Sequence, residues 1–147
     1  MIKRIINIDL DADAVNIGNE NTPAQIKDKV QFYNGNFIRG NPEKSLYDFT
    51  LLVGIVCPLT NESAKKVLQC VYKQMASRGT IAVSSSSYKM LRDDPICNIT
   101  IQLCSKWSLN FRTYDDLYNV LKGAGFKNIE ILYEPSAYNL IGIGTKE

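Results

Sequence analysis

The sequence predicts an α/β protein built around a mostly parallel sheet. Apolar runs of strand length alternate with segments of helical period, and two strand-like segments with a short connection close the chain. Strands joined through helices require right-handed crossovers, which place helices on both faces of the sheet. With 147 residues, 45% of them hydrophobic, the chain can bury one core of ordinary size. We therefore expect a single three-layer domain over residues 1–147, with an antiparallel hairpin at its C-terminal end.

The predicted strands follow from the apolar runs. Ile5–Asp9 and Val30–Tyr33 are short strands that end at polar, turn-forming residues. The segment "FTLLVGIV", Phe49–Val56, is the most apolar run of the chain and predicts a central, buried strand. "TIAVSSSS" predicts a strand from Thr80 that passes into a polar loop over the serines at 84–87. "NIEILYE" and "NLIGIGTKE" predict the terminal hairpin.

The segments between these strands carry helix start and stop signals. Asp11 is placed as the N-cap of a helix over "ADAVNIGNE", and the Thr22-Pro23 pair as the cap and first turn of a second, short helix. From Thr60 to Ser77 apolar residues recur every three or four positions, which predicts an amphipathic helix that Gly79 stops. A further helix with one apolar stripe follows Thr113, its N-cap.

Composition excludes several classes of function. The 17 basic and 15 acidic residues are scattered, so no cationic surface indicates a nucleic-acid or membrane partner. The four cysteines form no CxxC pair and the chain contains no histidine, so we expect no metal site and buried, reduced thiols. Asp9 and Asp11 interrupt the N-terminal apolar run before a signal sequence or a membrane span could form. These features predict a soluble protein of the cytoplasm.

The acids of "NIDLDAD" raise the question of a ligand. In a parallel sheet, ligands bind at the carboxyl ends of the strands, and Asp9 stands at the end of the first one. A carboxylate there can accept hydrogen bonds from both hydroxyls of a ribose. The alternative is structural: Asp9 ends a strand, while Asp11 and Asp13 cap the next helix and occupy its first turn. For Asp11 and Asp13 we expect the structural role.

The order of the segments resembles the class I S-adenosylmethionine-dependent methyltransferases, whose fold is Rossmann-like. "INIDLD" is similar to the second strand of that family with its ribose-binding acid, and "VQFYNGNF" to the third strand and the adenine-binding loop. "YDFTLLVGIV" is similar to the fourth strand, "MASRGTIAVSSSS" to the fifth, and "TYDDLYNVLKGAGF" to the helix before the terminal hairpin. The resemblance implies S-adenosylmethionine as the cofactor. It also implies that the residues that bind it are Asp9, Leu10, Asn36, Phe37, Gly54 and Ile55.

One element of the family pattern is missing. The family's first strand and Gly-rich loop would precede "IINIDLD", and no GxGxxG occurs in the chain. Because that strand is central in such sheets, we expect a truncated or split domain, or a sheet that closes differently. The expected function is methyl transfer to a small molecule, or that of a remnant of such an enzyme. The alternatives are a non-catalytic methyltransferase-like module, completed by a partner chain or a second copy, and, ranked lower, a nicotinamide-binding module.

Candidate catalytic residues are few, and none is assigned. Without histidine the serine run cannot form a Ser-His-Asp site, and Cys57 is expected to be a buried small hydrophobe. A proton would have to pass to a carboxylate or a tyrosine, or leave by the substrate's own ionisation. The Pro-Pro dipeptide of many amino-methylating members is absent, which favours a small-molecule acceptor over a nucleic-acid base. In related methyltransferases the segment before the last helix often covers the substrate; here its rings, which could instead pack the core, are Tyr88, Trp107, Phe111 and Tyr114.

Overall fold

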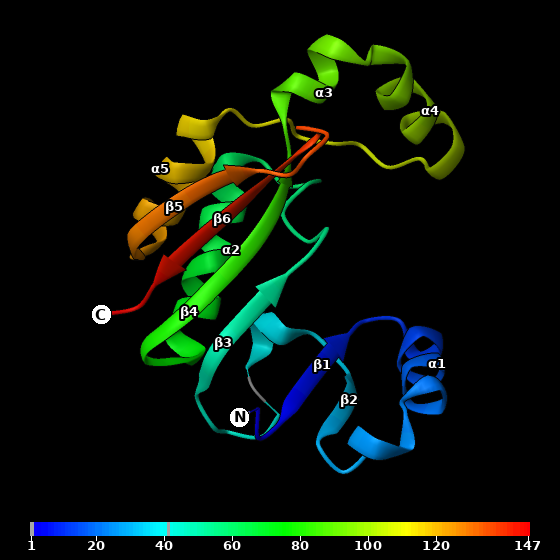
Figure 1. Ribbon diagram of the computed structural model, residues 1–147, viewed down its shortest axis with the longest axis vertical. Coiled ribbons are helices and arrows are strands. Elements are labelled where there is room, and N and C mark those ends of the chain that lie inside the picture. The colour runs from blue at the N-terminus through cyan, green and yellow to red at the C-terminus, as the bar shows by residue number, and fades with distance from the viewer. Residues whose placement is uncertain (1, 41) are drawn as a thin grey trace. The chain divides into compact units, whose positions relative to one another are not determined.

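The structure, a computed structural model, describes residues 2–40 and 42–147 of the chain. These residues form two compact units, the first ending at Ser45 and the second extending from Leu46 to Glu147 (Figure 1). Each unit has a sheet of its own and is described by itself. Our expectation of one domain over residues 1–147 stays a prediction.

The first unit is a strand-helix-strand motif. Its elements are β1 (Ile5–Asp9), α1 (Ala12–Asn21), the 3-10 turn η1 (Ala24–Ile26), β2 (Val30–Asn34) and the 3-10 turn η2 (Phe37–Arg39). β1 and β2 are parallel, in a register that places Asp9 opposite Asn34. Because parallel neighbours need a crossover, the chain passes through α1 and η1 before it returns to the sheet.

Two side chains determine the ends of α1. The Asp11 carboxylate accepts hydrogen bonds from the backbone N–H groups of Asp13 and Ala14, so its predicted role as N-cap is confirmed. The Thr22 hydroxyl donates to the carbonyl of Gly18 at 2.7 Å and therefore belongs to the end of α1. Our prediction that Thr22 caps a second helix is wrong, because its side chain bonds backward to the helix that precedes it.

Packing within the first unit is limited to the contact between α1 and its sheet. A Cβ atom added at Gly18 would lie 2.3 Å from the Phe32 ring, so a larger residue there would require the ring to move. Val15 is the one buried apolar side chain among the residues described up to position 45. Little apolar surface is therefore buried by this unit itself.

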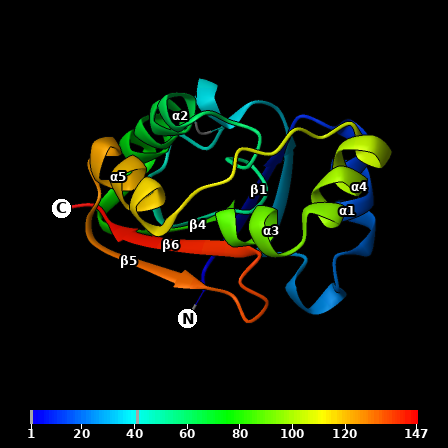
Figure 2. The same cartoon turned by 90° about the horizontal axis from the view of Figure 1, so that it is seen from above.

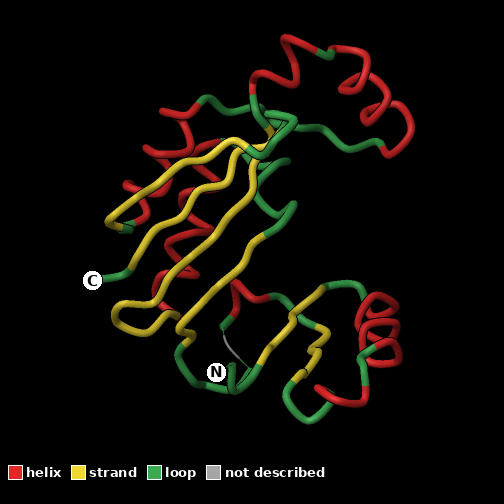
Figure 3. Tube along the Cα trace, viewed as in Figure 1, coloured by secondary structure: helices red, strands yellow, loops and turns green. Residues whose placement is uncertain are grey.

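The second unit is a mixed four-stranded sheet with helices (Figure 3). The strand order is β3-β4-β6-β5, with β3 parallel to β4 and with β6 antiparallel to both β4 and β5. The predicted α/β class and the C-terminal antiparallel hairpin are therefore confirmed. The elements are β3 (Tyr47–Leu52), α2 (Asn61–Gln74), β4 (Met75–Ser86), α3 (Tyr88–Asp93), α4 (Pro95–Ser105), α5 (Tyr114–Ala124), β5 (Lys127–Tyr133) and β6 (Asn139–Thr145).

Helices α2 and α5 lie side by side against the same face of this sheet, as Figure 2 shows from above. Thr60 caps α2, and Thr113 caps α5 as predicted, each accepting a hydrogen bond from a backbone N–H of the first turn. In α5 the carboxylate of Asp116 bonds back to the N–H of Thr113, which completes a capping box. The fully buried side chains of this unit include Leu68, Met75, Ile81, Val83, Leu117, Leu121, Phe126 and Leu140.

The position of β3 corrects one prediction. We expected Phe49–Val56 to be a central, buried strand, but β3 ends at Leu52 and forms the edge of its sheet. Leu52 is buried, whereas Phe49, Leu51 and Val53 are 58%, 61% and 67% exposed. A continuous apolar run is the pattern of a strand covered on both faces, and the pattern alone cannot show whether both neighbours are present.

The serine run corrects a second prediction. We expected residues 84–87 to form a polar loop, but Ser84–Ser86 complete β4 and Ser87 caps α3. Residues 85–87 are buried. Serine is tolerated here because three of the four hydroxyls accept a hydrogen bond from a neighbouring donor.

Gly79 also has a different role from the one predicted. It lies inside β4, because α2 ends at Gln74 and the strand follows directly. A Cβ atom added at Gly79 would lie 2.9 Å from the carbonyl oxygen of Ala76 and 3.0 Å from that of Tyr47. Close approach of the backbone, and not a helix stop, therefore requires glycine at this position.

The strands of the described residues form two separate sheets. β1 pairs with β2 and β3 pairs with β4, both in parallel, as expected for a mostly parallel sheet. No ladder joins the two pairs within residues 2–40 and 42–147, so they belong to separate sheets there. The backbone groups on the outer side of β3 consequently have no strand partner in the described part of the chain.

Candidate functional site

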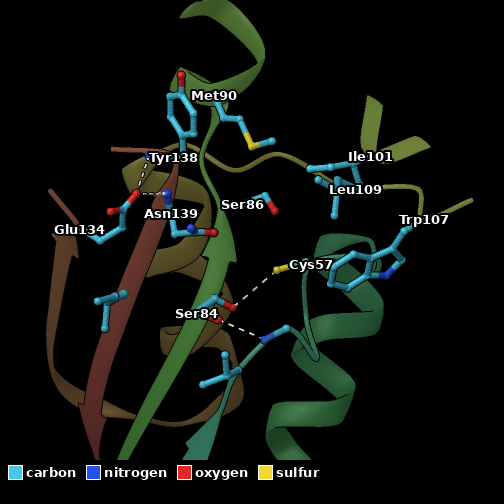
Figure 4. Close-up of a pocket in the computed structure, with 13 residues that line it drawn as sticks. Cys57, Ser84, Ser86, Met90, Ile101, Trp107, Leu109, Glu134, Tyr138 and Asn139 are labelled. Atoms are coloured by element: carbon cyan, nitrogen blue, oxygen red, sulfur yellow. Dashed lines mark hydrogen bonds between the residues drawn. The ribbon is translucent and has the colours of Figure 1, made fainter. Parts of the chain in front are cut away.

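A pocket of about 500 Å³ lies at the carboxyl ends of β3 and β4 (Figure 4). Its walls come from the end of β4, the loop after β3, helices α3 and α4, the segment before α5, and the turn between β5 and β6. Ligands of α/β sheets bind at this end of the strands, in pockets of about this size. The lining residues are Val53, Gly54, Cys57, Ser84, Ser86, Met90, Ile101, Trp107, Leu109, Glu134, Tyr138, Asn139 and Ile141.

Much of the lining is apolar and comes from segments far apart in the sequence. Met90 on α3 is buried, and Ile101 on α4 is partly exposed. Trp107 is 42% exposed, and its ring would lie 3.7 Å from a Cβ atom added at Gly54. Figure 4 shows Met90 and Trp107 on different sides of the pocket. Adaptable methionine and aliphatic side chains beside an aromatic ring favour a flat, apolar ligand.

Two serines of β4 contribute polar groups to this apolar lining. The Ser84 hydroxyl accepts a hydrogen bond from the N–H of Gly54 at 3.1 Å, which connects the loop after β3 to β4. Gly54 has a φ of 73°, a left-handed conformation that favours glycine and turns the chain away from β3. Ser86, two residues beyond Ser84 on the same face of the strand, is 4% exposed. The side chain of Ser86 makes no hydrogen bond within the described part of the chain.

On the opposite face of β4, Arg112 holds the loop that follows β3. It is 1% exposed, and it donates to the Ser85 hydroxyl at 2.9 Å and to the carbonyl of Val56 at 3.0 Å. It also donates to the side-chain oxygen of Asn61 at 2.8 Å and to the carbonyl of Leu59. Burial lowers the pKa of Arg112. Because the partners are uncharged, the guanidinium stabilises the pocket wall through hydrogen bonds and not through an ion pair.

The ionisable groups of the pocket are already engaged. The Glu134 carboxylate accepts hydrogen bonds from the hydroxyl and N–H of Ser136 and from the N–H groups of Tyr138 and Asn139. These bonds, that of the Ser136 hydroxyl above all, lower the pKa of Glu134 to about 2. The Tyr138 hydroxyl donates to Asp94 at 3.0 Å, and this bond raises the pKa of Tyr138. Neither group can accept a proton readily near neutral pH.

The cysteines are only partly as predicted. Cys57 is 5% exposed and lines the pocket, so its expected burial is confirmed. Cys104 is exposed, and Cys70 and Cys97 are partly exposed, so the expectation of buried thiols is wrong for these three. No group of three or more potential metal ligands occurs among the described residues. Within the same residues, no helix has the length and apolar character needed to cross a membrane.

The predicted ribose acid lies in the first unit. Asp9 is exposed at the carboxyl end of β1, where one of its oxygens accepts the N–H of Asp11 at 2.9 Å. The other oxygen makes no hydrogen bond in the described part of the chain. Asn36 follows β2, and its side-chain oxygen accepts the N–H of Ile38 at 3.0 Å and so caps η2. The structure thus places Asp9 and Asn36 at the carboxyl end of the same two-stranded sheet.

The six residues predicted to bind the cofactor are divided between the units. Gly54 lines the pocket of the second unit, and Ile55 beside it is 40% exposed and does not line it. Leu10 is 73% exposed. The four residues of the first unit are Asp9, Leu10, Asn36 and Phe37, and the two of the second are Gly54 and Ile55. Their binding of S-adenosylmethionine stays a prediction.

Among the aromatic residues predicted near a substrate, Trp107 lines the pocket, and Tyr88, Phe111 and Tyr114 do not. Sequence reasoning missed Ser86 and Arg112. Alternation could have found Ser86, because it continues the period of two along β4. No local pattern marks Arg112, since most of its partners lie more than fifty residues away.

Comparison with known proteins gives matches in structure only. No protein-family model matches the sequence, and no curated protein is similar to it in sequence. A Bordetella parapertussis protein described as a possible exported protein superposes with a TM-score of 0.79 at 12% identity, over 97% of this chain and 53% of that one. The S-adenosylmethionine complex of human N-acetylserotonin methyltransferase gives 0.73 at 17% identity, over 97% and 40%. An O-methyltransferase family 2 protein from Planctomyces limnophilus, in complex with apigenin, gives 0.77 at 14% identity, over 98% and 43%.

The chain has the fold of the class I S-adenosylmethionine-dependent methyltransferases. The predicted fold resemblance is therefore confirmed, including the Rossmann-like arrangement with its antiparallel hairpin. The chain spans 40% to 53% of the length of the three matched structures. At these identities the methyltransferase fold is what the likeness shows, and activity is a separate question.

Proposed function

We propose that the chain takes part in methyl transfer from S-adenosylmethionine to a small, apolar molecule. The observation that carries the proposal is the apolar pocket of about 500 Å³ at the carboxyl ends of β3 and β4. Structures of the same fold support it, since one is a complex with S-adenosylmethionine and another a complex with apigenin. The scattered charges of the chain favour such an acceptor over nucleic acid.

The residues of the first unit fit the cofactor chemically. Asp9 is exposed and keeps one carboxylate oxygen without a hydrogen bond, so it can accept bonds from a ribose. The side-chain oxygen of Asn36 uses one lone pair to cap η2 and retains a second for an adenine amino group. When bound, the cofactor would supply a sulfonium methyl group, whose carbon bonds to the acceptor while the electrons of the carbon–sulfur bond return to sulfur.

The pocket would orient the acceptor and exclude water, which are the main contributions that such a transfer needs. It supplies no base, because Glu134 is held by hydrogen bonds at a pKa of about 2 and Tyr138 donates to Asp94. The acceptor would then have to lose its proton by its own ionisation, before the pocket closes water out around it. Phenols ionise near pH 10, so they are better acceptors at this site than aliphatic alcohols.

A cytoplasmic location belongs to the same proposal. None of the four cysteines is in a disulfide, including the exposed Cys104. Exposed thiols persist in a reducing compartment. The alternative is that the chain is a remnant that keeps the fold but does not bind the cofactor. The following experiment distinguishes the two.

Titration calorimetry with S-adenosylhomocysteine tests the proposed function. We expect measurable binding, which Asp9→Ala weakens about tenfold to a hundredfold because hydrogen bonds to a charged group are lost. Asp11→Ala is the matched control, since Asp11 caps α1 and its loss acts on stability. Asn36→Ala should weaken binding less than Asp9→Ala, because an uncharged acceptor is removed.

Two results would contradict this proposal. No heat at millimolar ligand would mean that the chain is a remnant without a cofactor site. Binding that Asp9→Ala leaves unchanged would mean that the ligand lies elsewhere and that the carried-over ribose acid is wrong.

The edge of β3 favours a second candidate, a non-catalytic module that assembles with a second copy of the chain. Among the described residues β3 pairs with β4 alone; Phe49 and Leu51 are exposed along it, and Val53 is exposed just after its end. An exposed apolar edge strand is a template for a strand from another chain. Light scattering tests this candidate: a dimer that Leu51→Lys converts to monomer supports it, and a monomer at all concentrations excludes it.

A further inference from the structure

Asn34 connects the ends of the two strands of the first unit. It is the last residue of β2 and lies opposite Asp9 in the register of β1 and β2. Its side-chain amide donates to the carbonyl of Leu10 at 2.9 Å and to that of Asp9 at 3.3 Å. The N–H of Gly35 donates to the same Asp9 carbonyl at 2.8 Å. The chain that leaves β1 is therefore bonded to the end of β2 at two successive carbonyls.

The bond to Leu10 extends the connection beyond the regular strand pairing, which ends with Asp9 and Asn34. After this pair the chain turns from β1 into α1, and Leu10 in the turn is 73% exposed. An exposed turn between a strand and a helix is mobile unless its backbone is bonded to a neighbouring segment. The amide of Asn34 supplies such a bond from the opposite strand.

The carboxylate of Asp9 belongs to this same turn. One of its oxygens accepts the N–H of Asp11 at 2.9 Å, and the other makes no hydrogen bond in the described part of the chain. The bond from Asp11 can fix the carboxylate only if the backbone of residues 9–11 is itself fixed. The bonds to the carbonyls of Asp9 and Leu10 fix that backbone, so Asn34 acts on the carboxylate without touching it.

The residue predicted to bind adenine is held by a different bond. Asn36 accepts the N–H of Ile38 at 3.0 Å and so caps η2. Among the described residues, the side-chain amide of Asn34 bonds to the end of β1 and not to this turn. Loss of the Asn34 amide should therefore disturb a ligand's contact with Asp9 and leave its contact with Asn36 in place.

We propose that Asn34 is a positioning residue of the cofactor site, whose amide fixes the end of β1 so that the Asp9 carboxylate can receive both ribose hydroxyls. This inference rests on the proposed function, in which Asp9 binds the ribose. A purely structural role would differ in its consequences. If Asn34 only stabilised the first unit, its loss would weaken all ligands of that unit alike.

Two ligands that differ in the ribose separate these roles. The probes are S-adenosylhomocysteine and its 2′,3′-dideoxy analogue, which has no ribose hydroxyl to donate to Asp9, each titrated calorimetrically into the whole chain. The wild-type chain should bind S-adenosylhomocysteine at least about tenfold more tightly, the range of hydrogen bonds to a charged group. In Asn34→Ala the affinity for S-adenosylhomocysteine should fall about fivefold, while that for the analogue stays within about twofold. Retained binding of the analogue also shows that the variant is folded at the site.

Asn21→Ala is the matched control. Asn21 is exposed, belongs to the same unit, and donates through its side-chain amide to the carbonyl of Ile17 at 2.9 Å in the last turns of α1. A bond of the same kind is lost there, at the end of α1 away from Asp9, so both affinities should stay within about twofold of the wild-type values.

Asn34→Asp is a second variant, which keeps the size of the side chain. Its carboxylate presents only acceptor oxygens to the carbonyls of Asp9 and Leu10, so the two bonds are replaced by repulsion. The affinity for S-adenosylhomocysteine should fall at least as much as in Asn34→Ala.

The outcomes that overturn the inference concern the variants. An equal loss of affinity for both ligands in Asn34→Ala would mean that Asn34 stabilises the unit without positioning Asp9. Unchanged affinities, or a loss in Asn21→Ala as large as in Asn34→Ala, would also overturn it. Failure of the proposed function appears instead in the wild-type chain, as no binding of S-adenosylhomocysteine at millimolar concentration or as equal affinity for the two ligands, and the positioning role is then refuted with it.

Discussion

In residues 46–147, helices α2 and α5 cover a four-stranded sheet and enclose a core, whereas in the described residues up to position 45 one α-helix, α1, lies against two strands. Val15 is the one buried apolar side chain described in the shorter unit, and several others there are largely exposed. Both units have regular hydrogen-bonded strands and capped helices. Caps and strand pairing thus define local structure in both, but only the longer unit buries enough apolar surface to stabilise itself. The exposed apolar residues of the shorter unit are Ile2, Ile5, Leu10, Ile17, Ile26 and Ile38.

Hydrogen exchange should show the largest difference between the units. Amides in the centre of β4 and β6 should be protected at least about a thousandfold more than those of β1 and β2, because local opening of a segment without a core costs little free energy. Exchange followed by mass spectrometry on the intact chain measures this. Equal protection in both units would show that the first unit is stabilised by burial that its own residues do not provide.

Matched core substitutions sharpen the same contrast. Leu68→Ala removes a fully buried side chain of α2 and should lower the free energy of unfolding by about 3 kcal/mol. Val15→Ala, the corresponding change in the first unit, should lower it by about 1 kcal/mol or less, since fewer methyl groups are removed from a thinner layer. Urea denaturation of both variants gives the two values. A larger loss for Val15→Ala would contradict our view of the first unit.

Acid should act on the second unit through Glu134, the smallest of the expected effects. The folded-state pKa of Glu134 is about 2, below its ordinary value of 4.5, so its hydrogen bonds stabilise the hairpin fully above pH 4.5 and are lost as the pH falls toward 2. Glu134→Gln should remove this part of the pH dependence from urea midpoints. Glu130→Gln, at a β5 position without such bonds, should leave it in place; equal pH profiles for the wild-type chain and Glu134→Gln would refute the assignment.

Much of the fold could be predicted because its signals are local. The N-caps at Asp11 and Thr113 and the hairpin follow from a few adjacent residues, and all are confirmed. The edge position of β3 could not be predicted, because the same apolar run suits a strand with one neighbour or with two. The strand position of residues 84–87, for which we predicted a loop, could not be predicted either. Buried serines need hydrogen-bond donors, and here these donors come from distant segments.

The candidate site was predictable only in part. Trp107 was expected near a substrate and lines the pocket, and Asp9 stands at a strand end as expected. Ser86 could not be recognised, since its place in the pocket depends on segments that are distant in the sequence. The role of Glu134 also depends on the three-dimensional structure. Its carboxylate would be a candidate base if the hydrogen bonds of its own turn did not lower its pKa to about 2.

Arg112 joins segments of the chain that the ribosome makes at different times. Its partners Val56, Leu59 and Asn61 precede it by 56, 53 and 51 residues, so each bond closes a long loop. Loop closure over such separations is slow and follows the formation of local helices and hairpins. While the ribosome has not yet released Arg112, the carbonyls of the loop after β3 lack their donor, and the wall of the pocket cannot be fixed. This wall can therefore become fixed only after the chain has been synthesised as far as Arg112.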